Sequence, residues 1–194
     1  MIYELKISLL DTKPEIWRQV LIPGHFTFYR LHQVIQIAMG WQDSHLFSFH
    51  TGDFVSSDTI TLKEYLHDDD VYDRKEAGYK TMYAERKRIQ GYFSRCKSIF
   101  YTYDYGDFWQ HQVVKTGAID LEMDHAMCTC GKRACPADDC GGISGFYEML
   151  SSIANPKDPE YKEWRHWLGI QPDMDYEDAF GYKEELVNLI LQDV

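Results

Sequence analysis

Long apolar runs are missing from this sequence, and basic residues are outnumbered by acidic ones. No stretch approaches the roughly 18 uninterrupted apolar residues of a membrane helix, and residues 1–6 lack the apolar core of a signal peptide. The 20 Lys and Arg residues face 31 Asp and Glu residues, so the formal net charge is -11, which repels nucleic acid. We therefore expect a soluble cytoplasmic protein with no membrane contact and no nucleic-acid surface extending over the chain.

Common catalytic signatures are also missing. The chain has no Gly-rich phosphate loop and no H-E-x-x-H pair, and Gly142-Ile143-Ser144-Gly145 only superficially resembles a G-x-S-x-G elbow. Cysteine is scarce outside one segment, because Cys96 stands alone and the other four cysteines lie within residues 128–140. That spacing does not suit a secreted disulfide framework. Reduced thiols or a bound metal are the better interpretations.

The chain does hold enough apolar side chain for one core. Its 194 residues are 44% hydrophobic and 15% aromatic, which predicts a single domain over residues 1–194. Alternating residues predict strands over 2–10 and 16–22. A helical face runs from Leu31 to Met39, with Thr27 as its N-cap and Gly40 just beyond its end.

Three further segments carry turn or cap signals. Residues 45–50 predict a strand that enters a hairpin, with Phe54 and Val55 on the return. The capping-box spacing of residues 61–64 predicts a short helix. Aromatic and β-branched residues over 99–103 and 109–114 predict two strands joined by the turn 104–107.

Composition changes between residues 68 and 97. Three aspartates are followed by a segment in which eight basic residues face three acids, without a clear period. We interpret residues 68–97 as a solvated insertion, with a dedicated anion-binding patch as the alternative.

Helical patterns dominate the C-terminal part. One helix is expected around Phe146–Ile153 with Ser144 as its N-cap, and another begins at Asp158-Pro159-Glu160 and ends at Gly169. A last helix carries an apolar set at helical spacing, Leu186, Leu189 and Ile190. The fold class is therefore α+β, a mainly antiparallel sheet with a helix in the N-terminal half and a group of C-terminal helices.

The cysteine-rich segment is the first candidate site. Cys128, Cys130, Cys135 and Cys140 follow the pattern C-x-C-x4-C-x4-C among Gly, Pro and Asp residues. Four thiolates are typical ligands of structural zinc, although a C-x-C pair is tighter than usual. His125 or His111 is an alternative fourth ligand. Buried reduced cysteines, or a redox thiol at Cys140 whose pKa a following helix lowers, are the competing interpretations.

The second candidate site is the turn of the strongest hairpin. Asp104, Asp107 and His111 lie around Gly106 and supply acid-base groups or hard metal ligands, together with His45 or His50. Turn geometry and ordinary core packing explain the same residues, so both interpretations stay open.

Three stretches of the chain resemble the plasmid pRiA4b ORF-3-like family: residues 16–18 with Leu31-His32 and Gly40-Trp41, the hairpin 103–111, and the Cys-Pro-x-x-Asp-Cys-Gly-Gly run 135–142. The resemblance spans nearly the whole chain. It departs at residues 68–97, at Tyr105, where Phe is commoner, and at Ala137-Asp138, where Pro-Glu is commoner. It implies an α+β domain associated with mobile elements. Some members are labelled resolvases, but this chain lacks a clustered basic surface and a recombinase nucleophile arrangement.

Three functional hypotheses follow. The first is a cytoplasmic binding or accessory domain that contacts an unknown protein partner and whose cysteine loop holds a structural zinc. The second is a metal-dependent or acid-base enzyme that uses the Asp104–His111 hairpin, which requires its polar side chains to converge in a pocket. The third is nucleic-acid handling for a mobile element through Arg86-Lys87-Arg88, which requires salt-sensitive DNA binding.

Overall fold

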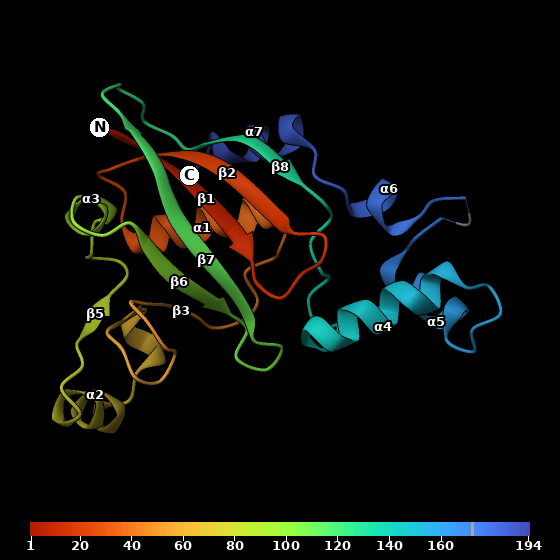
Figure 1. The fold of residues 1–194 in the computed structure, drawn as a ribbon, viewed down its shortest axis with the longest axis horizontal. Helices are drawn as coiled ribbons and strands as arrows, with labels where there is room; N and C mark the ends of the chain where they lie inside the picture. Colours follow the sequence, from red (N-terminus) through yellow and green to blue (C-terminus); the bar gives the residue numbers. More distant parts are fainter. Residues whose placement is uncertain (172) are drawn as a thin grey trace.

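One sheet organises the molecule. The computed structural model describes residues 1–171 and 173–194. Within them, eight strands form a single sheet in which every neighbouring pair is antiparallel except β4 and β5 (Figure 1). In spatial order the strands are β5 (Thr81–Tyr83), β4 (Thr59–Thr61), β3 (Phe47–His50), β6 (Ser98–Tyr103), β7 (Trp109–Ile119), β1 (Ile2–Leu9), β2 (Ile16–Pro23) and β8 (Met127–Lys132).

Helices cover one face of the sheet and extend beyond its end. They are α1 (Phe28–Met39), the 3-10 turn η1 (Lys63–Tyr65), α2 (Asp68–Glu76), α3 (Ile89–Phe93), α4 (Gly142–Ala154), α5 (Tyr161–Leu168), α6 (Tyr176–Phe180) and α7 (Glu184–Leu191). Figure 1 shows α1 lying across the sheet, with α4, α5 and α6 gathered to one side. The α+β prediction is confirmed. Over the described ranges, no helix has both the length and the apolarity needed to cross a bilayer.

The first two strands and α1 form where the sequence predicts them. Along β1, Leu5 and Ile7 are fully buried while Lys6 is only half-buried, so one face of the strand enters the core. The Thr27 hydroxyl accepts a hydrogen bond from the backbone N–H of Arg30 at 3.2 Å, which caps α1. Gly40 ends the helix in the left-handed conformation, with φ 90°.

The hairpin of β6 and β7 is also confirmed, whereas the return from β3 is wrong. The return strand is β4, which pairs Ile60 with Phe49, and not the predicted Phe54 and Val55. The Asp53 carboxylate accepts the N–H of Val55 at 2.9 Å, and this local turn takes the predicted pair out of strand geometry. The Thr61 hydroxyl donates to the Phe47 carbonyl, so it caps no helix.

The basic segment is only partly a solvated excursion. None of the residues of α2 is buried, as expected. In contrast, β5 adds a parallel strand to β4, and Ala84, Ile89 and Phe93 are fully buried in the core. The prediction of a solvated segment is therefore wrong for residues 81–93. The consecutive basic residues Arg86-Lys87-Arg88 interrupt the few apolar residues that anchor the segment, so no apolar period is visible in the sequence.

The C-terminal helices are present with shifted ends. Gly141 is the N-cap of α4, and the predicted cap Ser144 lies inside the helix. The expected helix after Asp158 begins only at Tyr161 and ends at Gly169, as predicted. The short helix α6 was not predicted, because its five residues carry too little apolar periodicity.

The last helix, α7, turns its predicted apolar face outward. Leu186, Leu189 and Ile190 are 54%, 63% and 47% exposed. Val187 and Leu191 are the buried residues instead. Strand β8 was not predicted either, so the segment that holds Cys128 and Cys130 is a strand and not a loop.

The edge of β8 is closed by a side chain of α7. The Asn188 amide oxygen accepts from the backbone N–H of Cys128 at 2.8 Å, and its NH₂ donates to the Cys128 carbonyl at 2.8 Å. A side-chain amide thus makes the two hydrogen bonds that a further strand would make.

Arg18 is a buried cation that joins four segments. It is 2% exposed, and its Nε donates to the Ala38 carbonyl at 2.7 Å, at the end of α1. Its two terminal nitrogens donate to backbone carbonyls of neighbouring chain segments, namely Trp17, Lys132 and Arg133, at 2.9 to 3.0 Å. The guanidinium also lies 4.7 Å from the Tyr182 ring centroid. Carbonyl oxygens and an aromatic face therefore replace the water that burial removes.

Replacing Arg18 by lysine tests this arrangement. An ammonium group has three donors and no planar fork, so Arg18→Lys leaves several of these carbonyls unpaired. We expect a loss of about 3 kcal/mol or more in the free energy of unfolding, measured with urea. Arg30→Lys on the exposed side of α1 is the matched control, and we expect it to change stability by less than about 1 kcal/mol. Equal effects of the two substitutions would contradict the role of Arg18.

Candidate functional site

The turn between β6 and β7 buries a carboxylate. Asp104 is 7% exposed and has a left-handed backbone, with φ 55°. Its Oδ1 accepts the N–H of Gly106 at 2.8 Å, and its carbonyl accepts the N–H of Phe108 at 2.7 Å. With Oδ1 engaged in the turn, Oδ2 remains to face His45.

The loop Cys135–Gly142 packs against this turn. The Trp41 indole N–H donates to the Pro136 carbonyl at 2.9 Å, which fixes the first half of the loop to the segment after α1. The Asp107 carboxylate accepts the N–H of Gly141 at 3.1 Å, which fixes the second half to the hairpin. Two segments about thirty residues apart in the sequence are thereby held in contact.

Gly142 permits this close approach. A Cβ there would lie 2.7 Å from the Asp107 carbonyl oxygen, and the residue has φ 68°. Gly141 has φ 89°, so both residues adopt a conformation that side chains disfavour. The Gly-Gly pair is therefore required by geometry where the loop meets the hairpin.

Three metal-ligating side chains converge where the loop and the hairpin meet. His45 Nε2 lies 3.3 Å from Asp139 Oδ1 and 3.7 Å from Asp104 Oδ2. All three donor atoms lie within 4.8 Å of one another. Among the described residues, no other group of three or more His, Cys, Asp or Glu side chains brings its donor atoms this close together. His45 Nε2 is buried and has no hydrogen-bond partner among the described residues.

The spacing of these atoms suits a single ion. Two ligands of one tetrahedral zinc at the usual bond lengths lie roughly 3.4 Å apart, close to both distances from His45. One imidazole and two carboxylates form a donor set that suits zinc or manganese. These residues fit a divalent metal without a large movement of the backbone.

An open cleft adjoins the cluster, and its volume is about 350 Å³. His45 and Asp104 lie in its wall with Asp43, Ser44, Leu46, Tyr65, Tyr105 and Gly106. The His45 ring packs edge-on against Tyr103, with ring centroids 5.7 Å apart, which fixes the orientation of the imidazole. A molecule in this cleft therefore reaches His45 and Asp104 directly, whereas Asp139 does not line it.

The predicted trio Asp104, Asp107 and His111 does not form one cluster. Only Asp104 belongs to the converging group, whereas the Asp107 carboxylate accepts the N–H of Gly141. His111 is fully buried, its Nδ1 lies 3.1 Å from the Trp109 carbonyl, and burial lowers its pKa to about 3. For His111 the structure corresponds to the packing interpretation.

His50 belongs to a separate buried network. Its Nε2 lies 2.6 Å from the Ser48 hydroxyl, and its Nδ1 lies 3.2 Å from the Thr59 hydroxyl. Burial and the positive charge of Arg74 lower the pKa of His50 to about 4. Of the two predicted companions of Asp104, His45 reaches it and His50 does not.

The four clustered cysteines have separate surroundings. Cys128 accepts a hydrogen bond from the Tyr182 hydroxyl at 3.2 Å, whereas Cys130 is exposed. The Cys135 sulfur lies 3.2 Å from the Met39 sulfur, and Cys140 is buried at the end of the loop. No three of these thiols form a converging group in the described part of the chain. Zinc held by these cysteines stays a prediction.

The pKa expected for Cys140 is wrong in direction. Burial, together with the negative charge of Asp107, raises the pKa of this thiol to about 12. Burial also raises the pKa of Cys135 to about 11. A thiol with so high a pKa is a poor nucleophile at neutral pH.

Asp139 is the member of the converging group that the sequence did not predict. It lies inside the Cys-Pro-x-x-Asp-Cys-Gly-Gly run, whose two cysteines are the more typical zinc ligands. Its left-handed backbone, with φ 60°, turns the carboxylate toward His45. The available signal was an acidic pair in a loop that contains two glycines.

Comparison with known proteins places the chain in a family. The family model described as "Plasmid pRiA4b ORF-3-like protein" matches residues 1–184. The chain belongs to the plasmid pRiA4b ORF-3-like family. The uncharacterized protein y4hQ of Sinorhizobium fredii (strain NBRC 101917 / NGR234) is 27% identical over 179 residues, which cover 92% of this chain and 84% of that protein.

A solved structure shows the same fold. The protein of unknown function MM3350 from Methanosarcina mazei Go1 superposes with a TM-score of 0.74 at 29% identity, covering 95% of this chain and 96% of the other. The two runs that carry the family resemblance, 103–111 and 135–142, each supply one carboxylate to the converging group, Asp104 and Asp139. The features that define this pRiA4b ORF-3-like chain thus meet at the candidate site.

The close approach at Gly142 gives a testable expectation. Gly142→Ala places a methyl group against the Asp107 carbonyl and strains the backbone, so we expect a loss of about 2 kcal/mol in the free energy of unfolding. Gly91→Ala in α3 is the matched control, because a Cβ there meets nothing within 4 Å. We expect the control to be neutral or stabilising by up to about 1 kcal/mol in the same urea experiment. A destabilised control with an unaffected Gly142→Ala would contradict this interpretation.

His111 predicts how stability depends on pH. The folded protein keeps this ring neutral down to about pH 3, whereas the unfolded chain takes up the proton near pH 6.5. Between about pH 3 and pH 6.5 the unfolded chain binds one proton more at this ring than the folded protein. The free energy of unfolding therefore decreases as the pH falls. We expect His111 to lower the free energy of unfolding by about 1.4 kcal/mol for each pH unit below 6.5.

Urea unfolding at several pH values within that window provides the measurement. His111→Gln removes one titrating group, so its free energy of unfolding should fall less steeply with decreasing pH, by the equivalent of one proton. His50 titrates in the same direction and keeps its own contribution in both proteins. Identical slopes for the wild type and the variant would show that His111 has the same pKa in the folded and unfolded states, which would contradict the prediction.

Proposed function

We propose that this protein binds a divalent transition metal, zinc or manganese, through His45, Asp104 and Asp139. The observation that carries the proposal is the convergence of three donor atoms within 4.8 Å, around an imidazole nitrogen that has no hydrogen-bond partner among the described residues. Hydrogen bonds of Asp104 and Asp107 hold the two motif segments in place before any ion arrives. Such preorganisation favours metal affinity.

The open cleft supports a catalytic use of the metal. Three protein ligands leave coordination positions for water or substrate, unlike a closed structural site with four thiolates. A bound zinc ion supplies Lewis acidity and lowers the pKa of its water. The residues of the chain would hold the ion beside a cleft of about 350 Å³, a size suited to a small polar substrate. We therefore favour a metal-dependent enzyme over a purely structural domain.

A partner-binding role is the second candidate. It rests on the exposed apolar face of α7, formed by Leu186, Leu189 and Ile190. These residues follow the i, i+3, i+4 spacing with which a helix presents one face to a partner. Nucleic-acid handling has weaker support, because the net charge of the chain is -11.

Metal titration of the protein tests the first proposal. After removal of metal with EDTA, we expect about one equivalent of Zn²⁺ or Mn²⁺ to bind in a calorimetric titration. Each of His45→Gln, Asp104→Asn and Asp139→Asn removes a ligand and should weaken binding by at least about tenfold. Asp107→Asn is the matched control, since its amide oxygen still accepts the Gly141 N–H and the residue is not a proposed ligand.

The cysteine variant separates the two metal hypotheses. If Cys135→Ser, Cys140→Ser abolishes binding while Asp104→Asn does not, the metal lies on the cysteines and the proposal is wrong. Urea unfolding of every variant without metal distinguishes the loss of a ligand from the loss of the fold. Binding that every variant retains would also contradict the proposed site.

A further inference from the structure

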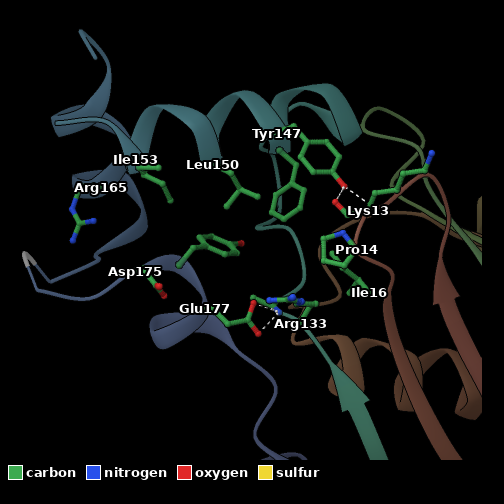
Figure 2. Close-up of a pocket in the computed structure, with 14 residues that line it drawn as sticks. Lys13, Pro14, Ile16, Arg133, Tyr147, Leu150, Ile153, Arg165, Asp175 and Glu177 are labelled. Atoms are coloured by element: carbon green, nitrogen blue, oxygen red, sulfur yellow. Dashed lines mark hydrogen bonds between the residues drawn. The ribbon is translucent and has the colours of Figure 1, made fainter. Parts of the chain in front are cut away.

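A second cavity lies on the other side of the loop that follows β8. Its volume is about 290 Å³, and its walls come from the turn between β1 and β2, from α4 and from α6 (Figure 2). Its lining is mostly apolar and includes Ile16, Phe146, Leu150, Ile153 and Tyr176. None of the three proposed metal ligands lines it.

The walls of this cavity are fixed by hydrogen bonds. The Tyr147 hydroxyl accepts from the Lys13 backbone N–H at 2.6 Å and donates to the Lys13 carbonyl at 3.2 Å, which joins α4 to the β1–β2 turn. Both oxygens of Glu177 accept the Ala134 N–H at 3.1 Å, which joins α6 to the chain after β8 (Figure 2). A cavity whose walls are already in place loses little entropy when a ligand enters.

The charged side chains at the rim differ in whether they have hydrogen-bond partners. The two carboxylates accept backbone N–H groups: Glu177 from Ala134, and Asp175 from Asp178. Arg165 donates to the carbonyls of Gln171 and Met174. The Arg133 guanidinium has no carboxylate within 4.0 Å among the described residues and makes no hydrogen bond there. The Lys13 ammonium, which also has no carboxylate partner among the described residues, points away from the cavity in Figure 2. The rim therefore offers one cationic fork with all its donors available.

Arg133 also has an unusual backbone. Its φ is 72°, in the left-handed region, and its carbonyl is held by the buried Arg18 guanidinium at 2.9 Å. This conformation is disfavoured for a long side chain, and such strain concentrates at binding sites. Arg133 is exposed at the rim, and Figure 2 shows it on the opposite side of the cavity from Leu150.

We propose that this cavity binds a small amphipathic carboxylate, with its apolar body between α4 and α6 and its carboxylate on Arg133. The apolar lining suits an aliphatic or aromatic body, and a guanidinium fork pairs with a carboxylate through two parallel hydrogen bonds. A volume of about 290 Å³ limits the ligand to a small molecule. The site is independent of the proposed metal centre.

The probe for this proposal is 4-phenylbutyrate, with 4-phenylbutan-1-ol as its uncharged analogue. We expect saturable binding of the carboxylate to metal-free protein in EDTA, measured by calorimetry. The alcohol should bind about tenfold more weakly or worse, because it lacks the charge-assisted hydrogen bonds. The use of metal-free protein separates this test from the metal proposal.

Three variants locate the bound probe. Arg133→Gln should weaken carboxylate binding by about tenfold or more, and Leu150→Trp should abolish it by filling the cavity. Lys132→Gln is the matched control, because it removes the same charge one residue away without touching the cavity lining. Unfolding in urea confirms that each variant is folded.

Several results would overturn the proposal. Binding that does not saturate below about 5 mM would show that the cavity has no useful affinity for carboxylates. Equal loss in Lys132→Gln and Arg133→Gln would assign the effect to general charge. Equal affinity for the alcohol and the carboxylate would show that Arg133 does not recognise the carboxylate group.

Discussion

The buried guanidinium of Arg18 is the contact on which the arrangement of both sites depends. It reaches the end of α1 through Ala38, the end of β8 through Lys132, and the start of the following loop through Arg133. No residue but glycine fits at 131, because a Cβ there would lie 2.6 Å from the Arg18 side chain. Placing a cation in the core is unfavourable unless its donors are all satisfied. Here four backbone carbonyls and the Cys135 sulfur, at 3.4 Å, accept the five N–H groups. The orientation of the loop is thereby coupled to the sheet.

That loop separates the two proposed sites. On one side it supplies Asp139 to the converging group, and on the other it supplies Arg133 to the apolar cavity. Both residues have left-handed backbones, as do Gly141 and Gly142 farther along the loop. Strained backbone persists only where its surroundings determine it, and here the hydrogen bonds of Asp107, Trp41 and Arg18 do so. The backbone of this loop is therefore held in place by these hydrogen bonds, although it is neither helix nor strand.

Local patterns predicted those elements whose stabilising contacts are local in sequence. Alternation predicted β1 and β2, and a cap, an apolar face and a final glycine predicted α1. Strand β8 was missed because its Cys-Thr-Cys-Gly composition lacks β-branched alternation, and pairing with β2 decides its structure. The candidate site shows the same limit. Local spacing predicted that Asp104 acts with Asp107 and His111, which are near it in the sequence. The observed partner Asp139 lies 35 positions away and is brought near by tertiary contacts.

The amide of Asn188 has a consequence for how the protein behaves in concentrated solution. An unpaired strand edge is a template on which a second chain adds by hydrogen bonding, and such addition leads to open-ended polymers. At β8, which spans Met127–Lys132, the amide occupies the N–H and carbonyl of Cys128, so an incoming strand finds the beginning of this edge already paired. The opposite edge, β5, spans only Thr81–Tyr83. The sheet therefore offers little unpaired length at either edge, which protects this wide, mostly antiparallel sheet from cross-β association.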